Sequence, residues 1–193
     1  MNIFLIGPSG SGKDTQASLI SKEFSLRWVS FGQIMRNRSL VNDEIGHHIA
    51  ATLASGHLVE WNYIADVIRD ELSKNSKNYV WTGFPRKADQ ADIFDKLVLE
   101  FSPESQVEMV INLVVSEDIA KQRIHFRKST NENVREDDKN DESIRQRLAW
   151  YSENIQALKE HYQKQGKYFE VNGEADVNIV FDDIKQLIYN FSQ

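Results

Sequence analysis

The chain has 193 residues, with 23 Lys and Arg against 29 Asp and Glu, so its net charge is −6, and it contains no cysteine. This length suits one compact domain, and the lack of cysteine excludes a disulfide scaffold, a zinc–thiolate site and a thiol nucleophile. The acidic balance argues against binding of nucleic-acid polymers, and the first apolar run (3–6) is too short for a signal sequence or a membrane span, so we expect a cytoplasmic protein that does not contact membranes.

Short apolar runs alternate with longer helical patterns along the chain, which is typical of βα units around a parallel sheet. The pattern predicts strands at 2–6, 27–30, 78–82, 107–115 and 167–171. It predicts helices at 13–24, 33–37, 43–55, 62–74, 88–99 and 117–126. Two later apolar stripes, from Ile144 to Tyr162 and from Val177 to Ile188, recur at steps of three and four and predict two more helices. We therefore expect an α/β fold with a doubly wound, five-stranded parallel sheet.

The segment after the first strand reads as a phosphate-binding loop that opens the first helix. Glycines let such a loop wrap closely around a phosphate, and the helix N-terminus adds a favourable field. Lys13 is placed to reach the terminal phosphates, and the Thr15 hydroxyl is placed to coordinate Mg²⁺ directly or through water. We expect an ATP site of the P-loop NTPase type, formed by Gly7, Gly10, Ser11, Gly12, Lys13, Asp14 and Thr15.

Two segments do not follow the simple alternation of strands and helices. Two or three helices follow one another between 33 and 76 without a strand, and 127–143 has a single aliphatic residue, Val134. The latter cannot bury itself, so it is either a disordered loop or a flap that closes on something. The Asn-Lys-x-Asp motif that reads guanine in GTPases is absent, which leaves a small-molecule kinase with a lid.

The chain resembles the adenylate kinase family of nucleoside monophosphate (NMP) kinases over essentially its whole length. The resemblance rests on the order and spacing of the loop 7–15 and of six further motifs, namely 30–36 (SFGQIMR), 54–59 (ASGHLV), 82–86 (TGFPR, followed by Gln90), 122–127 (QRIHFR), 135–138 (REDD) and 140–148 (NDESIRQRL). It implies a core at 1–30, 66–126 and 144–193, a helical NMP-binding insertion at 31–65 and a short, metal-free lid at 127–143. It also implies a monomer.

The resemblance implies transfer of the ATP γ-phosphoryl group to a nucleoside monophosphate, with AMP + ATP giving two ADP as the first expectation. The cations expected to stabilise the transferred group are Lys13, Arg36, Arg86, Arg123, Arg127, Arg135 and Arg147. Within that set, Arg36 and Arg86 would hold the acceptor phosphate. Arg123 and Arg135 would hold ATP, and Arg127 and Arg147 would bridge the two nucleotides. The expected NMP-binding residues are Phe31, Gly32, Arg36, Leu58, Val59, Gly83, Arg86 and Gln90.

Three positions depart from the family pattern, because Asp14 replaces a Gly, Gln33 replaces an Asp, and Thr82 replaces an Asp near Mg²⁺. One interpretation is that Mg²⁺ is held more weakly, with Thr82 bonding a metal-bound water and Asp14 substituting in part. The other is neutral drift, with water filling the gap.

The identity of the acceptor rests on two residues. Gln90 favours AMP, whereas Phe31 stands where the family has a Thr and could stack on any base. A CMP, UMP or deoxynucleotide kinase is therefore an alternative. So are a nucleotide-binding protein with weak or no turnover and a kinase for a sugar or shikimate-like acceptor.

Overall fold

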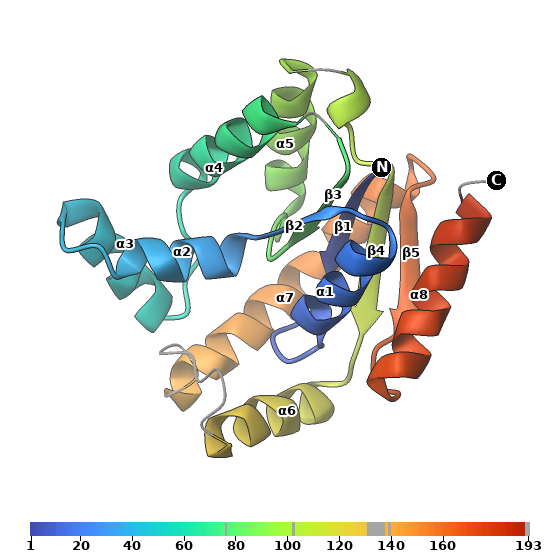
Figure 1. Cartoon of the computed structure of the whole chain (residues 1–193). Helices are drawn as coiled ribbons and strands as arrows, with labels where there is room; N and C mark the ends of the chain where they lie inside the picture. The colour runs from blue at the N-terminus through green and yellow to red at the C-terminus, as the bar shows by residue number, and fades with distance from the viewer. Residues whose placement is uncertain (76, 102, 131–137, 139, 192–193) are drawn as a thin grey trace.

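The computed structural model describes residues 1–75, 77–101, 103–130, 138 and 140–191. Within these residues five parallel strands form one sheet in the order β2-β3-β1-β4-β5 (Figure 1). The strands are β1 (Asn2–Ile6), β2 (Arg27–Ser30), β3 (Tyr79–Thr82), β4 (Met109–Val114) and β5 (Tyr168–Asn172). The predicted five-stranded parallel sheet is confirmed, with ends that differ from the predicted ones by two residues at most.

The described helices follow the predicted order along the chain. They are α1 (Lys13–Glu23), α2 (Phe31–Ser39), α3 (Glu44–Ala54), α4 (Trp61–Lys74), α5 (Ala88–Leu99), α6 (Glu117–Ser129), α7 (Asp141–Gln163) and α8 (Val177–Phe191), with a short 3₁₀ turn η1 (Pro103–Ser105). Helix α2 is longer than the predicted 33–37, because Ser30 caps its N-terminus by accepting a hydrogen bond from the Gln33 N–H. Helix α6 runs three residues into the segment predicted as the lid, where Arg127 and Lys128 suit a helix C-terminus.

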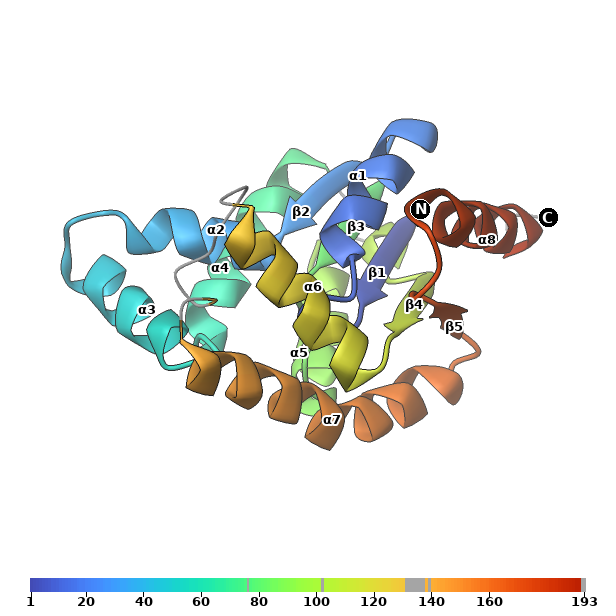
Figure 2. The same cartoon turned by 90° about the horizontal axis from the view of Figure 1, so that it is seen from below.

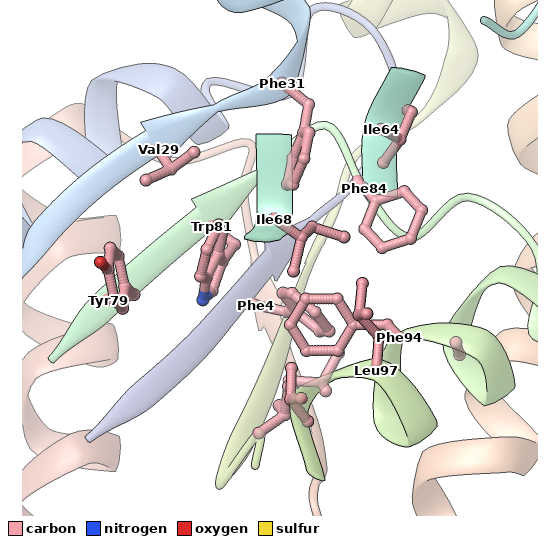
Figure 3. Close-up of a cluster of buried hydrophobic side chains, with 14 of the residues drawn as sticks. Phe4, Val29, Phe31, Ile64, Ile68, Tyr79, Trp81, Phe84, Phe94 and Leu97 are labelled. Carbon is pink, nitrogen blue, oxygen red and sulfur yellow. The ribbon is translucent and has the colours of Figure 1, made fainter. Parts of the chain in front are cut away.

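The sheet is covered on both faces, which is why its strands read as nearly continuous apolar runs. Strand β1 turns Phe4 and Ile6 toward α4, α5 and α7, and Ile3 and Leu5 toward α1 and α8. The first face is rich in aromatic rings, and Phe4 packs edge-on against Phe94 with ring centroids 4.8 Å apart (Figure 3). Layers on both sides of one sheet make the doubly wound arrangement that the sequence predicts.

Helices α2 and α3 project from the side of the sheet (Figure 1). A small apolar cluster of their own, made by Met35, Ile49 and Val59, holds this part together. Helices α6 and α7 lie side by side, as the view from below shows (Figure 2), and pack through residues that include Ile124 and Ile144. Helices α2 and α3 belong to the segment predicted as the NMP-binding insertion. The C-terminal end of α6 and the first turn of α7 border the segment predicted as the lid, of which 131–137 and 139 lie outside the described residues.

The two late apolar stripes form α7 and α8, as predicted. One residue of the second stripe, Val177, is 49% exposed, and it is the first residue of α8. None of the described helices has both the length and the apolar composition that crossing a membrane requires.

Candidate functional site

The phosphate-binding loop has the backbone geometry that its glycines predict. Gly10 and Gly12 have φ angles of 84° and 88°, in the left-handed region that side chains disfavour. A Cβ on Gly10 would lie 2.4 Å from the carbonyl oxygen of Ala120, so α6 passes directly against the loop. Gly12 caps α1 without a side-chain hydrogen bond, and the Ser11 hydroxyl is buried with no partner among the described residues. The helix N-terminus is thus left for an anion to cap.

A pocket with about 570 Å³ of empty space, part of it open to solvent, lies beside this loop. Lys13 lines it and donates a hydrogen bond from Nζ to the Pro8 carbonyl, 3.0 Å away, which holds the ammonium over the loop. Arg86 and Arg147 line the same pocket from the segment after β3 and from α7. The structure therefore brings together three of the predicted cations, from three distant parts of the sequence.

A second pocket, of about 380 Å³, lies between α2, the turn before α4 and the segment after β3. Its lining contains most of the residues predicted for the acceptor, namely Phe31, Gly32, Leu58, Val59, Gly83, Arg86 and Gln90. The two pockets share Gly83, Phe84 and Arg86, so they adjoin.

Arg36 is the predicted acceptor residue that does not line the second pocket, although it lies beside it. A Cβ on Gly32 would be 3.1 Å from the Arg36 Nη1. The Gln33 Oε1 accepts a hydrogen bond of 3.1 Å from the Arg36 Nη2. Gln33 therefore holds the guanidinium without adding the negative charge that an Asp would place there.

Gln90 and Arg86 fix each other in the wall of the second pocket. The backbone N–H of Arg86 donates to the Gln90 Oε1 at 2.8 Å, and the Arg86 Nε donates to the Gly83 carbonyl at 3.0 Å. Because an N–H must meet an acceptor, the first contact settles which end of the Gln90 amide is oxygen. The side chain predicted to read the base is thus oriented by the residue predicted to hold the phosphate.

Phe31 belongs to the aromatic core as well as to the pocket. Its side chain is 1% exposed, it stacks on Trp81 with ring centroids 5.7 Å apart, and it packs against Phe84 (Figure 3). Trp81 and Phe84 both pack on the ring, and the predicted stacking of Phe31 on a base stays a prediction. Phe31 forms an apolar wall of the pocket.

Two predicted arginines, Arg127 of α6 and Arg147 of α7, meet at one carboxylate. Asp138 is fully buried, and it accepts hydrogen bonds from the Arg127 Nε at 2.8 Å and from the Arg147 Nη2 at 2.7 Å. Burial pushes the pKa of Asp138 upward, but the hydrogen bond from Arg147 and the charge and hydrogen bond of Arg127 outweigh it and hold that pKa below its ordinary value. Asp138 therefore stays ionised and ties the ends of α6 and α7 together.

Neither Arg127 nor Arg123 lines either of the two pockets. Arg123 donates hydrogen bonds to the carbonyls of Gly173 and Glu174, at 2.7 and 3.1 Å, which ties α6 to the turn before α8. Arg135 lies outside the described residues, so its predicted contact with ATP stays a prediction.

Comparison with known proteins agrees with this geometry. The sequence model of the family described as adenylate kinase matches residues 5–167. A protein named adenylate kinase from Azobacteroides pseudotrichonymphae is 33% identical over 98% of both chains, and one from Methanothrix thermoacetophila is 29% identical over 99% of this chain and all of its own. The chain belongs to the adenylate kinase family. It is a nucleoside monophosphate kinase, a phosphotransferase that binds ATP and a monophosphate.

Phosphoryl transfer by adenylate kinases generally involves a divalent metal ion, and the oxygen atoms beside the loop fit one. Asp14 offers a carboxylate and Thr15 an exposed hydroxyl, which are hard oxygen donors of the kind that such ions prefer. Among the described residues, no group of three or more His, Asp or Glu side chains could hold a metal by itself.

Thr82 makes two hydrogen bonds to other side chains beside the loop. Its hydroxyl is fully buried, accepts a hydrogen bond from the Trp28 Nε1 at 3.1 Å and donates one to the Asp14 Oδ1 at 3.0 Å. The hydroxyl's one proton is thus used on Asp14. One lone pair of the hydroxyl remains, so the predicted contact of Thr82 with a metal-bound water stays a prediction.

Sequence reasoning missed two residues at this adenylate kinase site. Asp138 lies in the motif that leaves the lid, but no role was predicted for it. An acid between two arginine motifs is a signal, yet nothing local tells a buried acid from a solvated one. Trp28 is an unremarkable strand residue in the sequence, and its contact with Thr82 depends on the pairing of β2 with β3.

Proposed function

We propose that this chain transfers the γ-phosphoryl group of ATP to AMP, with ATP at the phosphate-binding loop and AMP in the second pocket. The observation that carries the proposal is the pair of adjoining pockets that share Gly83, Phe84 and Arg86. A phosphate oxygen of AMP would attack the γ-phosphorus, the bond from that phosphorus to the β–γ bridging oxygen would break, and two ADP would leave.

The proposed roles follow from where the cations lie. Lys13 and the loop backbone would hold the ATP phosphates, and Arg36 and Arg86 would hold the AMP phosphate. Arg147, in the wall of the first pocket, would contact both nucleotides. Their positive charge offsets the repulsion between two polyanions and stabilises the charge on the group in transfer. Arg127 supports this arrangement through Asp138, whereas the roles of Arg123 and Arg135 rest on the family resemblance.

The proposed metal is Mg²⁺, bound with ATP. When bound, it would neutralise phosphate charge and help to align the two nucleotides. Thr15 and Asp14 are the residues of this chain that would hold it, directly or through water. We also propose that the chain acts as a monomer, as the family resemblance implies; a cytoplasmic location stays a prediction.

An acceptor panel tests the reaction directly. The purified chain is incubated with ATP and Mg²⁺ and with AMP, dAMP, CMP or UMP, and ADP is measured by a coupled assay. We expect AMP to have the highest kcat/KM, because the oriented Gln90 amide lines the acceptor pocket. Turnover of CMP without turnover of AMP would contradict the proposed acceptor, and binding of ATP without formation of ADP would indicate a protein that only binds nucleotides.

Replacement of Arg86 by Lys tests the proposed phosphate contact. The variant keeps the charge but loses the planar fork and the hydrogen bond to Gly83, so we expect kcat/KM for AMP to fall about 100-fold. The matched control is Arg69→Lys, a change in a half-exposed arginine of α4 whose partner is Asp66. The control should keep the kcat/KM of the unmodified chain. Equal losses in the two variants would contradict the proposed role of Arg86.

A further inference from the structure

A chain of three hydrogen-bonded side chains connects β2, β3 and the first turn of α1. Trp28 on β2 donates to Thr82 at the end of β3, and Thr82 donates to Asp14, which lies directly after Lys13. Thr82 and Asp14 are 68 residues apart in the sequence, and the parallel pairing of β1 with β3 brings them together. The carboxylate is therefore held at the carboxyl end of the sheet, beside the phosphate-binding loop.

The position of this carboxylate poses an electrostatic problem. A negative side chain in the first turn of a helix is favourable with respect to the helix dipole. The same turn, however, follows a loop built to bind phosphate, and a phosphate anion is repelled by a carboxylate close to it. A divalent cation between the two anions reverses the sign, because both then attract the ion. The carboxylate and a phosphate can therefore lie close together when the nucleotide binds with its metal ion.

Thr82 and Trp28 have only neutral polar groups to offer. The buried Thr82 hydroxyl uses its proton on Asp14, and Trp28 supplies a donor to Thr82, so the carboxylate is the one charged group of this trio. A hydroxyl that accepts one hydrogen bond also becomes a better donor for the next. The trio is therefore built to position one negative charge.

We propose that Asp14 supplies the protein's negative charge to the metal ion of the bound nucleotide, and that Thr82 and Trp28 are positioning residues for its carboxylate. In this chain the acid thus comes from α1, whereas the family pattern expects it at the end of β3. The proposal rests on the proposed ATP site, but it does not depend on which monophosphate accepts the phosphoryl group.

The test measures nucleotide binding and needs no turnover. The affinity of the full chain for a non-hydrolysable ATP analogue is measured by titration calorimetry with excess Mg²⁺ and, separately, with EDTA. For Asp14→Asn we expect tighter binding of the analogue in EDTA, because the repulsion between carboxylate and phosphate is removed. The increase in affinity for the analogue on addition of Mg²⁺, here called the Mg²⁺ gain, should be about 10-fold smaller than in the unmodified chain. An equal weakening under both conditions, or an unchanged gain, would overturn the proposal. Electron paramagnetic resonance of Mn²⁺ in the same complexes gives a second readout of metal affinity.

Variants of Thr82 and Trp28 test positioning apart from charge. Thr82→Val and Trp28→Phe should shift the Mg²⁺ gain in the same direction as Asp14→Asn, but less, because each keeps the carboxylate. Thr82→Val removes both hydrogen bonds of the hydroxyl, and Trp28→Phe removes only the one that Trp28 donates. Thr82→Ser keeps the hydroxyl and should restore the gain. If Thr82→Ser and Thr82→Val behaved alike, the positioning role would be wrong.

The double variant Asp14→Gly with Thr82→Asp moves the carboxylate to the other side of the contact. We expect it to recover the Mg²⁺ gain to within about three-fold of the unmodified chain, because the charge returns to the same junction. No recovery in a variant that is folded by circular dichroism would overturn the proposal.

Glu44→Gln is the control for loss of charge alone. It removes an exposed acid from the first turn of α3, far from the loop, and the gain should not change. A fall there as large as in Asp14→Asn would show a general effect of charge and would overturn the proposal. The acceptor panel is a separate experiment. AMP turnover together with an unchanged Mg²⁺ gain in Asp14→Asn would refute this inference alone. A lack of AMP turnover together with a reduced Mg²⁺ gain in Asp14→Asn would refute the AMP reaction alone.

Discussion

At the scale of single residues, Asp138 shows why a buried arginine that is predicted to be catalytic needs more than its own charge. Arg147 is 8% exposed, so its guanidinium has little water to solvate it and depends on a counterion. Asp138 provides that counterion and shares it with Arg127. Two flexible side chains thereby lose rotational freedom before any substrate binds, which lowers the entropy that binding must overcome.

Replacement of Asp138 by Asn should destabilise the fold. The amide keeps the shape but removes the buried charge that Arg127 and Arg147 share, so we expect the free energy of unfolding to fall by about 3 kcal/mol, measured by urea denaturation. The control is Asp141→Asn, because the Asp141 side chain is 80% exposed and pairs with Lys128 at 3.6 Å. That pair should contribute less than about 1 kcal/mol. Similar losses in the two variants would show that burial of Asp138 has no energetic consequence.

The same carboxylate predicts a dependence of stability on pH. Because the pKa of Asp138 is lower in the folded chain than in the unfolded chain, its stabilisation is complete above the unfolded value, about 3.9, and is lost as the pH falls through the folded value. The difference in unfolding free energy between the unmodified chain and Asp138→Asn should thus be constant from about pH 8 to pH 5. It should shrink below about pH 4. A difference that already shrinks between pH 7 and pH 6 would mean that another group titrates.

At the scale of elements, the packing of α3 against the loop that precedes it depends on one glycine. A Cβ on Gly46 would lie 1.9 Å from the Val41 carbonyl oxygen, which is backbone and cannot rotate away. The same turn is closed by Asp43, which accepts a hydrogen bond from the Gly46 N–H at 2.7 Å and pairs with Arg38. The approach of α2 and α3 is therefore fixed by backbone contact.

The variant Gly46→Ala tests this contact. Alanine raises helix propensity by up to about 1 kcal/mol, but the clash should dominate and lower the local stability of α3 by about 1–3 kcal/mol. Hydrogen exchange of the α3 amides measures that local stability. Ala51→Ser, on the exposed side of the same helix, should change it by no more than about 0.5 kcal/mol. Slower exchange in Gly46→Ala would show that propensity outweighs the contact.

The elements were largely predictable from the sequence, whereas the contacts between them were not. Apolar runs and helical periods predict the strands and most of the helices, because both signals are local. The loop at 7–15 predicts the position of Lys13 for the same reason. The hydrogen bond from Thr82 to Asp14 depends on how two strands pair, and the burial of Asp138 depends on how two helices meet. No local pattern carries that information.

At the scale of the whole molecule, the net charge of −6 and the binding of two polyanions are compatible. Lys13, Arg86 and Arg147 line one pocket, and Arg36 lies beside the next, so positive charge is concentrated where phosphate is expected. Acidic residues elsewhere on the surface set the total without cancelling this local field, because exposed charges more than about 10 Å apart are largely screened by salt.

The adjoining pockets make a final prediction about a ligand that occupies both. A bisubstrate dinucleotide, two adenosines joined by a polyphosphate long enough to span the pockets, should bind at least about 100-fold more tightly than ATP or AMP alone, because its second half binds at a high effective concentration. A shorter polyphosphate should lose this gain. Titration calorimetry with both compounds measures the difference. If the longer dinucleotide bound no more tightly than ATP, the two pockets could not be filled at once, and direct transfer between them would be excluded.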